Sequence, residues 1–163
     1  MAPRLDNEAA PPLTLRRATG SDAHALALLR HEFRAPRATN TESRESFLSR
    51  CETWMRDRLD VASPWRVWIA EAGGEVVGTV WLQLVEKLPN PVAEGELHGY
   101  VSNLFVQQHA RNHGIGSGLL AAALDECVRL RVDNVFLWPT PESRTLYTRH
   151  GFGAAENMLV LRR

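Results

Sequence analysis

The most informative segment of this sequence reads Val106-Gln107-Gln108-His109-Ala110-Arg111-Asn112-His113-Gly114-Ile115-Gly116-Ser117-Gly118-Leu119-Leu120. It predicts a strand that ends in a glycine-rich turn and continues directly into an amphipathic helix. Glycines at alternate positions let the backbone approach a ligand closely, and the first N–H groups of a helix have no partners within it. Free amides at the positive end of a helix dipole favour phosphate oxygens. The stretch therefore predicts a site for a phosphate-bearing ligand; the alternative is a close-packed turn with no ligand.

Two common nucleotide-binding motifs do not fit this turn. A Walker A loop needs Lys followed by Ser or Thr after its last glycine, whereas two leucines follow Gly118. The dinucleotide fingerprint needs Gly-x-Gly-x-x-Gly near the start of a doubly wound domain. Here the spacing is Gly114-x-Gly116-x-Gly118, late in the chain. We therefore expect neither a nucleoside triphosphatase nor a dinucleotide-binding fold.

Length and composition predict a single domain over residues 13–163, preceded by a flexible tail at residues 1–12. The charges of nineteen basic and nineteen acidic residues cancel, so the chain has no net positive charge that would attract nucleic acid or an anionic membrane. No apolar run approaches the roughly 20 residues that span a bilayer, and the tail has no apolar segment typical of a signal peptide. Cys51 and Cys127 stand alone, so we expect buried thiols, no metal site and a cytoplasmic protein.

The pattern along the chain predicts a mixed α/β sheet in the order β-α-α-β-β-β-α-β-α-β. Strands are expected at residues 13–17, 65–70, 76–85, 96–106 and 135–138, with Gly73 and Gly74 turning the second into the third. A first helix should end before Pro36, and Thr41 is expected to cap a second. A third helix follows the glycine turn, and a fourth runs from Pro139 to a glycine cap at residue 151. Residues 152–163 are expected to close the sheet with at least one more strand.

Two segments of the sequence resemble the GCN5-related N-acetyltransferase (GNAT) superfamily, and the resemblance covers about residues 13–160. Residues 111–116 read Arg-Asn-His-Gly-Ile-Gly, which matches the family's acetyl-CoA pattern Arg/Gln-x-x-Gly-x-Gly/Ala. Residues 146–152 read Leu-Tyr-Thr-Arg-His-Gly-Phe and are similar to its Leu-Tyr-x-x-x-Gly-Phe segment. The resemblance implies a GNAT-like mixed central sheet, with helices on both faces and the fourth and fifth strands splayed apart.

The resemblance also implies acetyl-CoA as co-substrate. Amides of the glycine turn would hold the pyrophosphate, and pantetheine would pair with the fourth strand like an added strand. A main-chain N–H near Leu104 or Phe105 would polarise the thioester carbonyl. The residues expected against the cofactor are Leu104, Phe105, Val106, Arg111, Asn112, His113, Gly114, Ile115, Gly116, Ser117, Thr140, Ser143 and Tyr147. For Arg111 and His113 the alternative is a solvated position on the turn.

The sequence departs from the family pattern at four positions. Gln108 stands where the family often has Pro, and Asn112 where it often has Gly. Asn tolerates left-handed backbone geometry better than most residues, so we expect the turn to keep its shape. Thr140 and Ser143 replace a frequent Asn and a frequent Ala at the start of the last helix. These two replacements affect one cofactor contact but not the fold.

Tyr147 is the expected general acid, because a phenol near the sulfur can protonate the departing thiolate. The alternative is that it only packs the last helix against the sheet. Glu96 and His98 are the expected candidates for the base, since they alternate along the strand that precedes the turn and have suitable chemistry near neutral pH. The alternatives are solvent-exposed positions for both, Glu94 as a weaker third candidate, or loss of the amine proton to solvent.

We therefore expect an acyl-CoA-dependent N-acetyltransferase that moves acetyl to a primary amine of a small molecule by direct attack in a ternary complex. The resemblance implies that about residues 33–58 and 87–95 select the acceptor. Trp81 and Trp138 are expected in the core, and the alternative for both is the wall of the cleft. The alternatives are acetylation of a protein N-terminus or lysine, and a non-catalytic acyl-CoA-binding regulatory module. Homodimers are frequent in the family, and both a monomer and a homodimer remain open.

Overall fold

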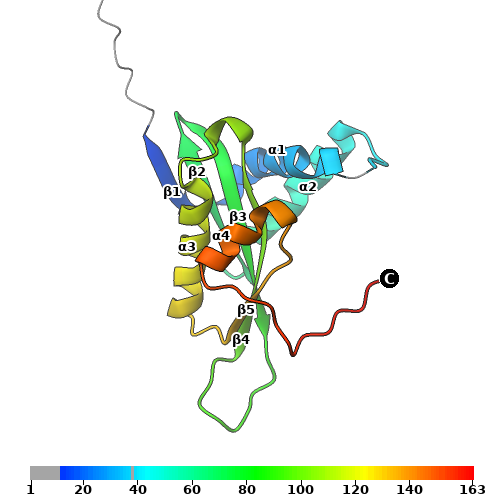
Figure 1. The fold of residues 1–163 in the computed structure, drawn as a ribbon. Helices are drawn as coiled ribbons and strands as arrows, with labels where there is room; N and C mark the ends of the chain where they lie inside the picture. Colours follow the sequence, from blue (N-terminus) through cyan, green and yellow to red (C-terminus); the bar gives the residue numbers. More distant parts are fainter. Residues whose placement is uncertain (1–11, 38) are drawn as a thin grey trace, which may run out of the picture.

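The computed structural model describes residues 12–37 and 39–163. The expected N-terminal tail lies outside these residues, except for Pro12. Figure 1 shows the elements, which follow in the order β1 (Leu13–Arg17), α1 (Ala23–Arg34), α2 (Arg44–Arg58), β2 (Trp65–Ala72), β3 (Glu75–Glu86), β4 (Leu97–Val106), α3 (Ile115–Arg129), β5 (Asn134–Phe136) and α4 (Arg144–Arg149). Short 3-10 turns lie at Gly20–Asp22, Ala35–Arg37, Gln108–Ala110 and Pro141–Ser143.

The five strands form one mixed sheet in the order β1-β2-β3-β4-β5, which confirms the predicted fold class. The pairs β1–β2, β2–β3 and β3–β4 are antiparallel, and the pair β4–β5 is parallel. β4 pairs with β5 only at residues 98–100, which face residues 134–136. Beyond residue 100, β4 has no ladder partner on its β5 side among the described residues, so the two strands splay as expected.

The strand expected at residues 152–163 is absent, and this prediction was wrong. Residues 153–163 are exposed and form no strand, and in Figure 1 this segment, in red, extends away from the sheet. The segment has strand-forming residues, with Leu159 and Val160 among them. However, a strand needs a neighbour that supplies its hydrogen bonds, and β5, the adjacent edge, is only 3 residues long. In the described residues, β5 therefore remains the edge of the sheet.

The second helix begins slightly later than predicted. Ser43, not Thr41, is its N-cap, and the Ser43 hydroxyl accepts a hydrogen bond from the N–H of Ser46 at 3.1 Å. The helix then runs to Arg58, and α3 has the same length of 15 residues. Within residues 12–37 and 39–163, no helix is long and apolar enough to cross a bilayer.

Helices cover both faces of the sheet, as expected, and each face has its own core. On one face, Leu119 and Leu120 of α3 pack with Val80 and Leu82 of β3. On the other, α1 and α2 pack against side chains of β2 and β3. Figure 1 shows α1 and α2 together, away from α3. Cys51 and Cys127 are both free thiols and both buried, one in each core, as predicted.

Candidate active site

A β-bulge shapes β4 near the point where it leaves β5. Thr79 of β3 faces Phe105, and Trp81 faces Ser102, so Asn103 and Leu104 together oppose one residue of β3. Asn103 has φ 51°, in the left-handed region that Asn tolerates better than most side chains. A bulge bends its strand and increases the local twist. Here it lies on the part of β4 whose main chain has no partner on the β5 side.

The glycine turn that follows β4 keeps the shape expected from the sequence. Gly114 is the N-cap of α3 with φ 75°, and Asn112 has φ 65°, which confirms that Asn can replace glycine there. The side chain of Arg111 closes the turn, because its Nε donates to the carbonyl of Val106 at 2.9 Å. The N–H of Gly118 bonds to the carbonyl of Gly114 at 2.9 Å. The N–H groups ahead of it lie at the positive end of the helix.

A cleft of about 500 Å³, here called the turn cleft, runs along the glycine turn and the free side of β4. It brings together every residue expected against the cofactor except His113, which does not line it. Phe33, Arg37 and Arg149 also line it and were not foreseen from the sequence. The predicted cofactor residues along its wall are Leu104, Phe105, Val106, Arg111, Asn112, Gly114, Ile115, Gly116, Ser117, Thr140, Ser143 and Tyr147.

A second cleft of about 510 Å³, here called the aromatic cleft, lies between α1, α2 and the start of the gap between β4 and β5. Tryptophans 54, 65, 81 and 138 line it, together with Tyr100 and two arginines. It shares part of its wall with the turn cleft: Phe33, Leu104, Thr140, Ser143 and Tyr147 line both. The two clefts therefore meet at the start of the last helix.

Tyr147 lies at this junction and is 9% exposed. Burial raises the pKa of its phenol above the ordinary value, and the hydroxyl of Ser143 opposes that shift. The phenol is therefore protonated at neutral pH, as a proton donor must be. Its ring also packs edge-on against Phe152, with ring centroids 5.8 Å apart, so Tyr147 is part of the core as well as of both clefts.

The capping residues of the last helix also line both clefts. The hydroxyl of Ser143 accepts a hydrogen bond from the main-chain N–H of Thr140 at 2.9 Å and donates to its carbonyl at 3.1 Å. These bonds fix the turn at Pro141–Ser143 from which α4 begins. Thr140 and Ser143, two of the four positions that depart from the family pattern, thus form the cap of the helix that carries Tyr147.

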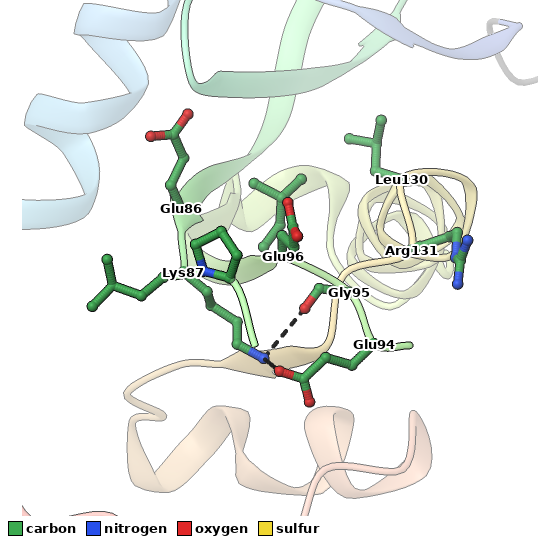
Figure 2. Close-up of a pocket in the computed structure, with 10 residues that line it drawn as sticks. Glu86, Lys87, Glu94, Gly95, Glu96, Leu130 and Arg131 are labelled. Atoms are coloured by element: carbon green, nitrogen blue, oxygen red, sulfur yellow. Dashed lines mark hydrogen bonds and ion pairs between the residues drawn. The ribbon is translucent and has the colours of Figure 1, made fainter. Parts of the chain in front are cut away.

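Glu96 lies in a third pocket, away from Tyr147. Figure 2 shows this pocket, which the β3–β4 connection forms with the end of α3. Beside Glu96, the Nζ of Lys87 bonds to Glu94 at 3.0 Å and to the carbonyl of Gly95 at 3.2 Å. The third candidate, Glu94, is therefore held in an ion pair, and Glu96 does not line either cleft.

His98 lies on the paired part of β4, opposite Asn134 of β5. Its Nδ1 is buried and has no hydrogen-bond partner among the described residues. His98 does not line either cleft. The next ring on the same strand face, Tyr100, stacks on Phe136 at 5.3 Å and does line the aromatic cleft. The structure thus brings Tyr147 together with the cofactor residues but not with the two base candidates.

The wall of the aromatic cleft differs from the sequence expectation. The region at residues 33–58 contributes to it, but the residues between 87 and 95 contribute to the third pocket. Trp138 is 54% exposed and lines the cleft, so the cleft-wall alternative is correct and the core expectation was wrong; β5 ends two residues earlier and leaves this side chain at the mouth of the gap. Arg30 was not foreseen, since an arginine on an amphipathic helix normally indicates a solvated face.

In the described parts of the chain, no cluster of three His, Cys, Asp or Glu side chains is placed to hold a metal ion.

Comparison with known proteins agrees with this arrangement. The sequence model of the acetyltransferase (GNAT) family matches residues 27–152, whereas no curated protein sequence matches. A predicted acetyltransferase from Clostridium acetobutylicum, solved with acetyl-CoA, has a TM-score of 0.77 at 18% identity over 93% of this chain and 96% of its own. A ribosomal-protein-alanine N-acetyltransferase from Brucella melitensis has a TM-score of 0.69 at 21% identity, over 93% of this chain and 100% of its own.

A third similar structure is the aminoglycoside N-acetyltransferase AAC(6')-Iy in complex with CoA, with a TM-score of 0.69 at 17% identity, over 98% of this chain and 99% of its own. At these identities the three structures share the fold, whereas the family match covers most of the sequence, including the glycine turn and Tyr147. The chain therefore belongs to the acetyltransferase (GNAT) family and is an acyl-CoA-dependent N-acetyltransferase.

Proposed function

We propose that this protein acetylates the primary amine of a small molecule by direct attack, with acetyl-CoA and the acceptor bound at the same time. The observation that carries the proposal is the meeting of the two clefts at Tyr147. One cleft has the features of a phosphate and pantetheine site, and the other has the size of a small-molecule site.

The turn cleft fits coenzyme A in shape and in charge. The free N–H groups at the start of α3 suit a pyrophosphate. Three arginines line the same cleft, Arg37, Arg111 and Arg149, against one carboxylate, that of Glu142. Within the described chain, the main chain of β4 has no partner on its β5 side after residue 100, which leaves an edge for an extended pantetheine arm. When bound there, acetyl-CoA supplies the acyl group as an activated thioester.

Tyr147 has the position and the protonation state of the general acid. As the amine nitrogen bonds to the acyl carbon and the C–S bond breaks, the leaving sulfur gains a negative charge. We assign to the Tyr147 hydroxyl the donation of a proton to that sulfur. The nitrogen loses its second proton as the amide forms, and water returns a proton to the Tyr147 phenolate. A main-chain N–H at Leu104 or Phe105, next to the bulge, would stabilise the developing charge on the carbonyl oxygen.

The acceptor amine loses its proton to water in this proposal. Among the described residues that line the aromatic cleft there is no Asp, Glu or His. Of the two residues predicted from the sequence as the base, His98 lies nearer to the aromatic cleft, because it is two positions before Tyr100 on β4. Glu96 lines the third pocket instead. We predict that His98→Ala and Glu96→Gln each change kcat by less than about threefold, because solvent takes the proton. A large loss in His98→Ala, with a shifted acidic limb of the pH–rate profile, would instead assign the base to His98.

The cleft favours a small molecule over a protein acceptor. The fold alone does not decide this, since an aminoglycoside acetyltransferase and a ribosomal-protein-alanine acetyltransferase both share it. A cleft of about 510 Å³ lies within the range typical of small-ligand sites, about 300–1,000 Å³. We also place the protein in the cytoplasm, where Cys51 and Cys127, both free, would stay reduced.

The direct test is Tyr147→Phe. We expect kcat to fall by about a hundredfold or more, since a positioned general acid contributes about 10²–10⁴ in rate. The affinity for acetyl-CoA should stay within about twofold, because the phenyl ring keeps the packing against Phe152. Thiol release from acetyl-CoA across an amine panel measures the first quantity, and titration calorimetry measures the second.

Tyr100→Phe is the matched control, because it removes a hydroxyl from the only other tyrosine of the chain, in the same aromatic cleft. Equal turnover in wild type and Tyr147→Phe would remove Tyr147 from the mechanism. Tight acetyl-CoA binding with no thiol release for any amine, in the wild type itself, would favour the non-catalytic binding module.

The raised pKa of Tyr147 also sets a pH dependence. An acid with a raised pKa stays protonated until the pH passes that pKa, so Tyr147 should cause no loss of activity between pH 7 and about 9. The rate should instead rise over this range, as more of the acceptor amine becomes neutral. A decline of kcat that begins near pH 8 in the wild type and is absent from Tyr147→Phe would contradict this assignment.

A further inference from the structure

The aromatic cleft carries positive charge without a matching negative charge. Arg30 and Arg34 of α1 line it, and no carboxylate lines it among the described residues. Elsewhere the arginines that approach the sheet are paired: Arg16 with Asp22 at 2.9 Å, and Arg66 with Glu126 at 3.5 Å. Neither Arg30 nor Arg34 has a carboxylate within ion-pair distance in the described chain.

Arg30 is half-buried and held in place at the cleft wall. Its Nη1 donates to the side-chain oxygen of Asn103 at 3.0 Å, and Asn103 is the left-handed residue of the β4 bulge. Burial lowers the pKa of Arg30, and the like charge of Arg34 adds to this. A half-buried charge is normally paired, so this geometry leaves one place for an anionic group of a ligand.

The rest of the wall is made of aromatic rings in two groups. Trp54, Trp65 and Trp81 lie with ring centroids 5.7 to 5.9 Å apart, and Tyr100 lies edge-on to Trp138 at 5.1 Å. Trp54 and Trp138 are 39% and 54% exposed. Large exposed aromatic rings around a cleft are typical of a surface that binds a flat apolar group.

One polar atom of this wall also lacks a partner. The indole N–H of Trp81 is buried and makes no hydrogen bond in the described residues, although a buried indole N–H normally finds an acceptor. Trp81 is 2% exposed and lines the cleft. This N–H has no accessible surface of its own, so it lies beneath the cleft wall, and the arginines are the donors that a ligand can reach.

We propose that the acceptor is an amine that also carries a carboxylate and an aromatic body, as in an aromatic amino acid, with the carboxylate on Arg30. This inference rests on the proposed function, because that function requires the amine group to reach the junction of the two clefts at Tyr147. It disfavours polycationic amines, since the described wall offers them no carboxylate. It equally disfavours a protein N-terminus, whose first residue has an amide in place of the free carboxylate.

Binding can be tested without acetyl-CoA, through the tryptophans themselves. Four of the five tryptophans line the cleft, so intrinsic fluorescence reports its occupancy. Two matched pairs isolate the carboxylate: L-phenylalanine against phenethylamine, and 4-(aminomethyl)benzoate against benzylamine. We expect the acid of at least one pair to bind about tenfold or more tightly than its carboxylate-free partner, as a charge-assisted hydrogen bond predicts. L-alanine, which lacks the ring, should bind more weakly than L-phenylalanine.

Arg30→Gln should remove this preference. The preferred acid should bind about tenfold more weakly, while its carboxylate-free partner should stay within about twofold. Arg44→Gln is the control, because Arg44 is an exposed arginine of α2 that lines neither cleft. If the carboxylate-free amine binds as tightly as the acid in both pairs, or if Arg30→Gln weakens both members equally, the proposal is wrong.

The binding assay and the turnover assay separate this inference from the proposed function. Carboxylate-dependent binding with no thiol release would uphold the inference and contradict catalysis. Thiol release with amines that lack a carboxylate, at rates that Arg30→Gln does not change, would uphold catalysis and contradict the inference.

Discussion

At the scale of single residues, Asn103 links the backbone of β4 to the charge in the aromatic cleft. Its left-handed φ of 51° costs about 1–2 kcal/mol for most side chains, and such strain often lies at functional positions. The same residue accepts the hydrogen bond from Arg30 at 3.0 Å. Asn103 is thus a positioning residue: the bulge orients its amide, and the amide orients the guanidinium.

Asn103→Gly separates these two properties. Glycine adopts a positive φ at little steric cost, so the bulge should persist while Arg30 loses its acceptor. We expect KM for a carboxylate-bearing amine to rise by about three- to tenfold, with kcat within about twofold and little change in Tm. Asn103→Ala should raise KM similarly and also lower the stability by about 1 kcal/mol. An unchanged KM in Asn103→Gly would show that Arg30 does not depend on this bond.

At the scale of elements, the junction of β4 and α3 can be tested through two of its glycines. Gly116 lies in the first turn of α3, where an added Cβ would meet Leu146 and Val106 at 3.7 and 3.8 Å, which is ordinary contact. Gly116→Ala should therefore leave the fold intact, or stabilise α3 by up to about 1 kcal/mol. Its methyl group would stand at the wall of the turn cleft, at the position where the family pattern accepts Gly or Ala, so we expect the affinity for CoA to stay within about twofold.

Gly114→Ala should give the opposite result in unfolding experiments. Gly114 has φ 75° and open space around an added Cβ, so the cost is backbone strain of about 1–2 kcal/mol. Denaturant unfolding and CoA titration of both variants measure the two effects. Parallel losses of stability and affinity in Gly116→Ala would support the alternative that this stretch is only a close-packed turn.

The elements also show what the sequence can and cannot predict. The glycine turn, the hairpin at Gly73 and Gly74 and the strand at β4 depend on local geometry, so their positions were correctly predicted. The strand expected after residue 152 depends on a partner edge, which the sequence pattern does not describe, and that prediction was wrong. The side chains of the aromatic cleft come from α1, α2, β2, β3, β4, α4 and the segment between β5 and α4, so only the fold shows that they meet.

At the scale of the whole molecule, the two clefts differ in how far the sequence predicts them. The turn cleft is built around one continuous segment, residues 104–117, and all its expected residues but His113 line it. The aromatic cleft is assembled across the sheet from residues as far apart as Arg30 and Trp138. The acetyl-CoA site can therefore be predicted largely from one local sequence segment, whereas the acceptor site can be identified only from the tertiary structure.

The arrangement of the clefts also predicts that acetyl passes directly from acetyl-CoA to the amine, with no covalent enzyme intermediate. Direct transfer needs both substrates at once, whereas a covalent route needs a nucleophile that meets the thioester. Burial raises the pKa of Cys127 to about 11 and also raises that of Cys51, and neither cysteine lines a cleft. Both thiols are therefore protonated and out of reach. We expect initial-rate plots against both substrates to intersect, and Cys51→Ala and Cys127→Ala to keep kcat within about threefold wherever they remain folded. Parallel lines, together with a loss of turnover in either folded cysteine variant, would contradict direct attack and assign the acyl group to a thiol.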